Sequence, residues 1–102
     1  MSEIIKVKVD PERLKRVAEI LKTIAHPVRL SIIELLQENR EMTVKDIQAI
    51  TQIDQSLVSH HLIKMKDKGV LTSERSGKNI YYGLVDQHIT SIFNCMEQCT
   101  LL

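Results

Sequence analysis

The stretch from Thr43 to Lys68 constrains the fold most, because its apolar residues recur at helical spacing in two short runs. In the second run, Val58, Leu62 and Met65 stand four and three residues apart, which places them on one face of a helix. The opposite face carries amide, hydroxyl, imidazole and ammonium groups, supplied by Gln55, Ser56, Ser59, His60 and Lys64. Such groups can hydrogen-bond to base edges in the major groove or contact phosphates. We therefore predict a helix-turn-helix over residues 43–68 whose second helix recognises DNA.

The first run of this pair consists of Val44, Ile47 and Ile50, which we expect to face the protein interior. Thr43 followed by Asp46 resembles a capping box and predicts the start of the first helix. Asp54 or Gln55 opens the second helix, and Gly69 is expected to end it in a left-handed conformation.

A β-hairpin is predicted directly after the two helices. Residues 70–75 alternate roughly as a strand, residues 76–79 have turn composition, and residues 80–84 form a returning strand. A hairpin over residues 70–84 would be the wing of a winged helix-turn-helix. It carries Arg75 and Lys78, cations that can reach a phosphate or the minor groove.

Two further helices are predicted before this unit. Asp10 and Pro11 form a strong helix start, and the helix that follows has one apolar face, made of Leu14, Val17, Ala18, Leu21 and Ile24. Either the domain body or a partner subunit must cover that face. His26-Pro27 starts the next helix, and we expect His26 to act as a cap or packing residue and not as a ligand. Arg29 falls on the polar side, where it could pair with an acid, and residues 37–42 are predicted to be a polar connection.

The composition of the 102 residues fits a single globular domain, with 43% hydrophobic and 26% charged residues. The net charge of +1 does not mark a nucleic-acid binder, but five Lys or Arg residues oppose three acids between Asp54 and Gly83. There is no signal peptide and no apolar run of the roughly 18 residues that cross a membrane, so we expect a cytoplasmic protein without a membrane partner. The sequence has no glycine-rich phosphate loop, paired carboxylates or supported Ser-His-Asp pattern, so we do not predict an enzyme.

Three segments in order resemble the ArsR/SmtB family of winged-helix repressors, namely residues 25–36, residues 55–71 and residues 80–84. The resemblance extends over roughly residues 14–99. It implies a mainly α fold of five helices plus the wing. Residues 4–9 alternate or extend, so we expect residues 1–9 to form an arm before the first helix. The resemblance also implies a homodimer formed through residues 10–25 and 86–102, a palindromic operator in double-stranded DNA, and release by an inducer. The alternative is a winged-helix module that binds proteins and not DNA. Such a module would be expected to expose apolar groups on the outward face, and Ile63 alone fits that expectation.

The last helix, expected from Asp86 to about Cys99, carries two candidate sensing sites. In the zinc-sensing branch of the family, this helix bears an Asp-x-His pair that Asp86 and His88 match, and Cys99 stands where the third ligand occurs. Leu102 stands at the fourth position and cannot ligate. Along one helix His88 and Cys99 would be about 16 Å apart, so Cys99 would have to come from the partner subunit to bind Zn²⁺ or another transition metal.

The second candidate is a thiol sensor formed by Cys95 and Cys99. The two cysteines are one helical turn apart, and a disulfide between them would strain a regular helix. Redox sensing would therefore need local unwinding or a bond between subunits. Simple packing of both cysteines against a partner subunit is the other interpretation.

Overall fold

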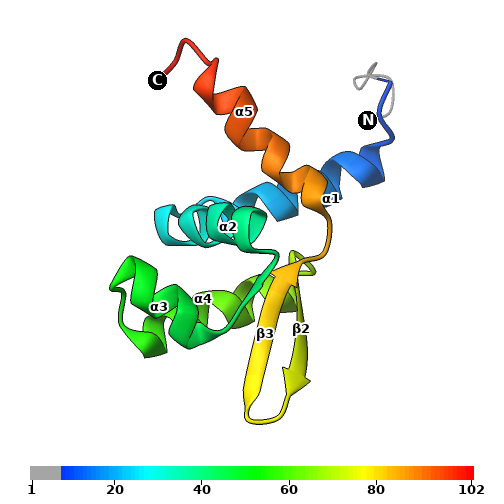
Figure 1. Ribbon diagram of the computed structural model, residues 1–102. Coiled ribbons are helices and arrows are strands. Elements are labelled where there is room, and N and C mark those ends of the chain that lie inside the picture. Colours follow the sequence, from blue (N-terminus) through cyan, green and yellow to red (C-terminus); the bar gives the residue numbers. More distant parts are fainter. Residues whose placement is uncertain (1–7) are drawn as a thin grey trace.

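The computed structural model describes residues 8–102, which form five α-helices, a three-stranded sheet and one short 3-10 helix (Figure 1). Most of the predicted arm at residues 1–9 lies outside the described residues. The elements in chain order are α1 (Pro11–Ile24), α2 (Pro27–Asn39), β1 (Glu41–Met42), α3 (Val44–Thr51), α4 (Gln55–Asp67), β2 (Leu71–Ser76), β3 (Asn79–Leu84), η1 (Gln87–Thr90) and α5 (Ser91–Glu97). This is the predicted winged helix-turn-helix.

Local capping explains where the helices begin. Thr43 and Asp46 form the predicted capping box at α3, since each side chain accepts a hydrogen bond from the other residue's main-chain amide. His26 caps α2, because its Nδ1 accepts from the Val28 amide at 3.2 Å, as the sequence indicated. Asp10 occupies the N-cap position of α1, but its side chain accepts no capping hydrogen bond from that helix. Pro11 at the first helical position, with its fixed φ, favours the start there.

The core lies between α2, α3, α4 and the sheet. Its fully buried side chains are Ile32, Ile33, Leu36, Ile47, Val58, Leu62 and Met65. Val58, Leu62 and Met65 are among them, which confirms the predicted inward face of α4. The prediction for Ile50 is wrong, because its side chain is 57% exposed. Ile50 follows the buried Ile47 by three residues and is therefore turned by about 60° around α3, away from the core.

The sheet has the order β1-β3-β2 and is antiparallel throughout. Residues 37–42 are not only a polar connection, because Glu41 and Met42 form β1, and Met42 pairs with Tyr82 and is buried. The wing turn places Gly77 at φ 64°, a left-handed conformation that favours glycine. Gly69 has φ 81° and follows Lys68, the C-cap of α4, so the predicted left-handed glycine lies at the end of this helix.

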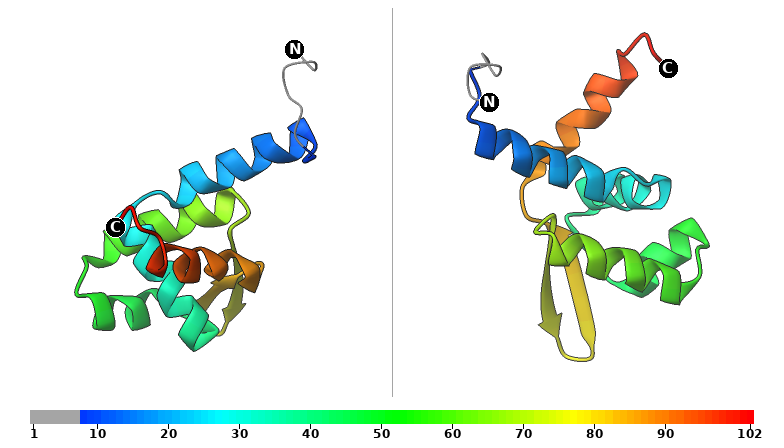
Figure 2. Two further views of the ribbon diagram at one scale, coloured as in Figure 1. Left: turned by 90° about the horizontal axis from the view of Figure 1, so that it is seen from above. Right: turned by 180° about the vertical axis from the view of Figure 1, so that it is seen from behind.

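The first and last helices extend away from the rest of the fold, at the end opposite the wing (Figures 1 and 2). The last helix is shorter than predicted, because residues 87–90 form η1 and the α-helix continues only from Ser91 to Glu97. The Cα radius of gyration is 15.7 Å, above the roughly 13 Å of a compact domain of about 100 residues. Among residues 8–102, no helix combines the length and hydropathy that crossing a membrane requires.

Candidate nucleic-acid interface

The outward face of α4 presents the polar groups that the sequence placed there. Gln55, Ser56, His60 and Lys64 are exposed and Ser59 is half-buried. A shallow concave surface is lined by Asp54, Gln55, Ser56, Ser59, His60 and Ile63. The structure therefore brings four of the five predicted groups of α4 onto one surface. Lys64 lies outside this surface, although it is exposed on the same helix.

Asp54 is the N-cap of α4 and settles which residue opens the helix. Its Oδ2 accepts a hydrogen bond from the Ser56 amide at 3.1 Å and another from the Ser56 hydroxyl. The hydroxyl bond, followed by the amide bond, holds the pKa of the Asp54 carboxyl below its ordinary value. Because the Ser56 hydroxyl donates its proton to Asp54, only its oxygen lone pairs remain for a ligand on the outer surface.

Two apolar side chains also lie on the surface of α4. Leu57 is 44% exposed and Ile63 is 49% exposed. The sequence pattern singled out Ile63 but not Leu57, because Leu57 adjoins the buried Val58 and gives no separate periodic signal. Apolar groups at such positions can contact the methyl group of thymine in the major groove.

The wing lies beside α4 at the same end of the molecule, whereas both described chain ends lie at the opposite end (Figures 1 and 2). Strands β2 and β3 pair from Leu71–Leu84 to Ser76–Asn79. Arg75 lies near the end of β2, Lys78 lies in the turn, and both are exposed. The hairpin therefore carries two cations beyond the body of the fold, where a phosphate can approach them.

Behind the recognition face, α4 is held by a polar contact that the sequence did not indicate. Arg29, which the sequence placed on the polar side with an acid as one candidate partner, donates from Nε to Nδ1 of His61 at 3.0 Å and from Nη1 to the carbonyl oxygen of Thr23 at 2.8 Å. His61 is only 4% exposed. Burial is the main cause that lowers the pKa of His61, and the neighbouring His26 and Arg29 lower it further.

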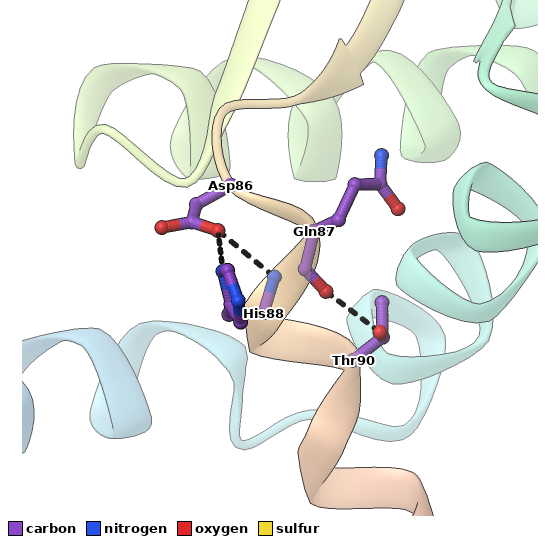
Figure 3. Close-up of polar contacts among 4 residues, drawn as sticks. All are labelled: Asp86, Gln87, His88 and Thr90. Atoms are coloured by element: carbon purple, nitrogen blue, oxygen red, sulfur yellow. Dashed lines mark hydrogen bonds and ion pairs between the residues drawn. The ribbon is translucent and has the colours of Figure 1, made fainter.

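The predicted sensing residues lie at the other end of the fold. Nδ1 of His88 is 2.8 Å from Oδ1 of Asp86, which also accepts from the His88 amide at 2.9 Å (Figure 3). Those two bonds, the amide bond first, lower the pKa of Asp86. Thr90 donates to the carbonyl of Gln87 at 2.7 Å and supports the same turn (Figure 3).

The third predicted ligand is not part of this pair. Cys99 is half-buried beyond the end of α5, and Cys95 is exposed on α5; both are free thiols. Within residues 8–102 of one subunit, no three His, Cys, Asp or Glu side chains gather closely enough to hold a metal ion. One subunit therefore offers two of the predicted ligands, Asp86 and His88, in one place.

Comparison with known proteins places this arrangement in a family. The profile of the family described as "Bacterial regulatory protein, arsR family" matches residues 26–73. The transcriptional repressor PagR of Bacillus anthracis is 38% identical over 90 residues, which are 88% of this chain and 90% of PagR. The crystal structure of PagR has a TM-score of 0.77 and covers 85% of this chain and 99% of the PagR chain.

Two mycobacterial proteins extend the comparison. The HTH-type transcriptional repressor SmtB of Mycobacterium tuberculosis is 38% identical over 81 residues, which span 79% of this chain but only 59% of SmtB. A homodimeric winged helix-turn-helix DNA-binding domain from Mycobacterium bovis, solved by NMR, is 25% identical with a TM-score of 0.73 and covers 91% of this chain and 87% of that domain. The chain belongs to the ArsR family of bacterial regulatory proteins, and it is a winged-helix, DNA-binding transcriptional regulator.

Proposed function

We propose that the protein is a cytoplasmic, homodimeric repressor that inserts α4 of each subunit into the major groove of a palindromic operator. The observation that carries this proposal is the division of α4 into two faces. Val58, Leu62 and Met65 are buried, whereas hydrogen-bonding groups occupy the surface beside the wing. A two-fold pair of such helices would read two equivalent half-sites in double-stranded DNA.

Each side chain has a role that its chemistry supports. Gln55 can make a bidentate contact to adenine, and Ser56, Ser59 and His60 can contact base edges. Lys64 on α4, and Arg75 and Lys78 on the wing, would contact phosphates, which fix the position of the protein on the duplex without reading sequence.

We call the concave surface of α4 lined by Gln55, Ser56, Ser59 and His60 the reading surface. The test replaces two of its groups, the Ser59 hydroxyl and the His60 imidazole. We expect Ser59→Ala combined with His60→Ala to abolish binding to a duplex selected by the wild type from a randomised pool, measured by fluorescence anisotropy. The control is Gln37→Ala, which removes an exposed hydrogen-bonding group of α2 and leaves the surface of α4 unchanged. Sequence-specific binding that persists in the first variant would show that another surface reads the operator.

Dimerisation is proposed to occur through α1 and α5. Leu14, Val17 and Leu21 are exposed on α1, and an apolar groove between α1 and the η1–α5 segment is lined by Ile24, Ile89 and Ile92 among others. A second copy is the proposed occupant, which agrees with the homodimer solved for the Mycobacterium bovis domain. A charge placed on this face would be buried without a partner.

The oligomeric state tests that surface directly. Leu21→Glu should convert the dimer to a monomer in sedimentation velocity, whereas Lys22→Gln, which changes the charge by the same amount on the same helix, should leave the dimer intact. If the wild-type protein sediments as a monomer at micromolar concentration, the proposed two-fold reading of DNA is wrong.

We further propose that a transition metal, with Zn²⁺ as the first candidate, is the inducer. Asp86 and His88 already face each other, and Cys99 of a second subunit would have to supply the third ligand, with Leu102 contributing none. A bound ion would supply a fixed positive charge and a crosslink between subunits. Competition with a chromophoric zinc chelator should reveal binding by the wild type, and His88→Ala should abolish it. Equal zinc binding by both proteins would contradict the assignment.

A thiol-reactive inducer is the second candidate, favoured by the exposure of Cys95. A two-electron oxidant such as a peroxide would take up two electrons and two protons from the Cys95 or Cys99 thiol and a thiol of the other subunit. The resulting disulfide would release the protein from DNA. Treatment with an oxidant should produce a crosslinked dimer on a non-reducing gel and lower DNA affinity together, and Cys95→Ser with Cys99→Ser should remove both effects.

A further inference from the structure

One half-buried side chain, that of Arg29, joins three helices. Its guanidinium donates to the carbonyl of Thr23 in the last turn of α1 and to the ring of His61 on the inner side of α4, while Arg29 itself belongs to α2. The proposed dimerisation helix and the recognition helix are therefore connected through this residue. His61 is the contact on the recognition helix, and it directly follows His60 on the reading surface.

Among residues 8–102, no acidic side chain is one of the charged groups that act on the His61 ring. Its ring centroid is 4.5 Å from that of His26, the N-cap of α2, and 5.5 Å from that of His60. The titratable or charged groups that act on it are His26 and Arg29 from the α2 side and His60 from α4, and each is neutral or positive. From α1 the contact is a main-chain carbonyl, reached through Arg29.

The bond between Arg29 and His61 exists only for one protonation state. Arg29 is always a donor, so Nδ1 of His61 must present its lone pair and the ring proton must sit on Nε2. A proton added to Nδ1 would set two donors and two positive charges against each other in a buried place. The same proton that is harmless on an exposed histidine would here break the contact.

We propose that Arg29 and His61 are positioning residues that hold the recognition helix α4 against the junction of α1 and α2. Protonation of His61 breaks this contact and frees α4, so operator affinity falls at acidic pH. The inference rests on the proposed function, because it assigns regulation to the same reading helix. Its physical basis is present in the free protein, so the contact can be tested without DNA.

The first experiment follows the free protein by NMR between pH 8 and pH 5. The Arg29 Nε–H resonance should report a hydrogen bond at pH 8 and lose it as the His61 ring takes up its proton. Hydrogen exchange of the α4 amides should accelerate over the same pH range. An Arg29 signal that is unchanged while His61 titrates would overturn the proposal.

The second experiment measures affinity for a duplex selected by the wild type from a randomised pool. Affinity of the wild type should fall severalfold between pH 7.5 and pH 5.5, because protonated His61 must lose its proton before the contact with Arg29 can re-form. His61→Gln keeps an acceptor at every pH and should bind as the wild type does at pH 7.5 without the acid loss. Lys22→Gln, on the exposed surface of α1, should retain the wild-type pH profile. Both variants keep His60, so any effect of that side chain cancels in the comparison.

The remaining outcomes also decide the question. A wild-type pH profile in folded His61→Gln would refute the release mechanism. If His61→Gln does not fold, Arg29→Met replaces it, because that variant lacks the hydrogen bond at all pH values and should show weak binding with no acid-dependent loss. Failure of the wild type to select any duplex at pH 7.5 would count against the proposed function, whereas the NMR titration would still test the contact.

Discussion

Nε of Arg29 lies 3.0 Å from Nδ1 of His61, and this bond ties α2 to the inner side of the recognition helix. Replacing Arg29 with Met keeps an aliphatic side chain of similar length but leaves Nδ1 of a buried ring without its donor. We expect the free energy of unfolding to fall by about 2 kcal/mol, the size of a hydrogen bond to a charged group. Urea denaturation at pH 8 and fixed protein concentration measures this loss.

The control for that variant is Arg75→Met on the exposed wing, which should change stability by less than about 0.5 kcal/mol. Equal stability of Arg29→Met and the wild type would mean that the bond contributes nothing to holding α4.

The stability of the protein should depend on pH through His61. The pKa of His61 is lowered by burial below the ordinary value of 6.5, so the unfolded chain takes up a proton in a pH range where the folded protein does not. The contribution of His61 is therefore complete above pH 6.5 and is lost as the pH falls from 6.5 toward the lowered pKa of the folded state. Urea midpoints at pH 8, 7, 6 and 5 should fall less for His61→Gln than for the wild type. Parallel curves for the two proteins would contradict this account.

Lys78 in the wing turn should act without regard to sequence, because a phosphate contact carries no base information. Lys78→Ala should weaken binding to selected and unselected duplexes by the same factor. The slope of log affinity against log salt should also decrease by about 0.9 for each phosphate that the variant no longer neutralises, and a dimer has two such positions. Lys22→Ala on α1, far from the wing, should change neither quantity. A loss confined to the selected duplex would assign Lys78 to base recognition.

The sequence predicted the features of the fold that arise between residues close in the chain. The spacing of Val58, Leu62 and Met65 and the capping box of Thr43 with Asp46 are local, and both are confirmed. Strand β1 was not predicted, because two residues carry no periodic signal and Met42 finds its place only by pairing with Tyr82.

The same distinction holds for the candidate site. The outward groups of α4 follow from helical spacing, and the structure places Gln55, Ser56, Ser59 and His60 on one surface. The Arg29–His61 bond joins residues 32 positions apart, and a pattern of apolar and polar residues says nothing about such a pair. The metal hypothesis has the same limit, because its third ligand would lie in another subunit and no spacing within one chain can place it.

Ser56 offers a sharper test of base recognition than its neighbours, because its hydroxyl proton is committed to Asp54. A hydroxyl that can only accept should face a base amino group, either N6 of adenine or N4 of cytosine, and should disfavour the carbonyl oxygens of thymine and guanine. Ser56→Ala should therefore reduce discrimination at one base pair in each half-site by roughly tenfold and leave the salt slope unchanged. Competition among duplexes that differ at single positions measures the effect, with Ser91→Ala as the control. A uniform loss across all duplexes, with a smaller salt slope, would show instead that Ser56 contacts a phosphate and that the bond to Asp54 opens on DNA.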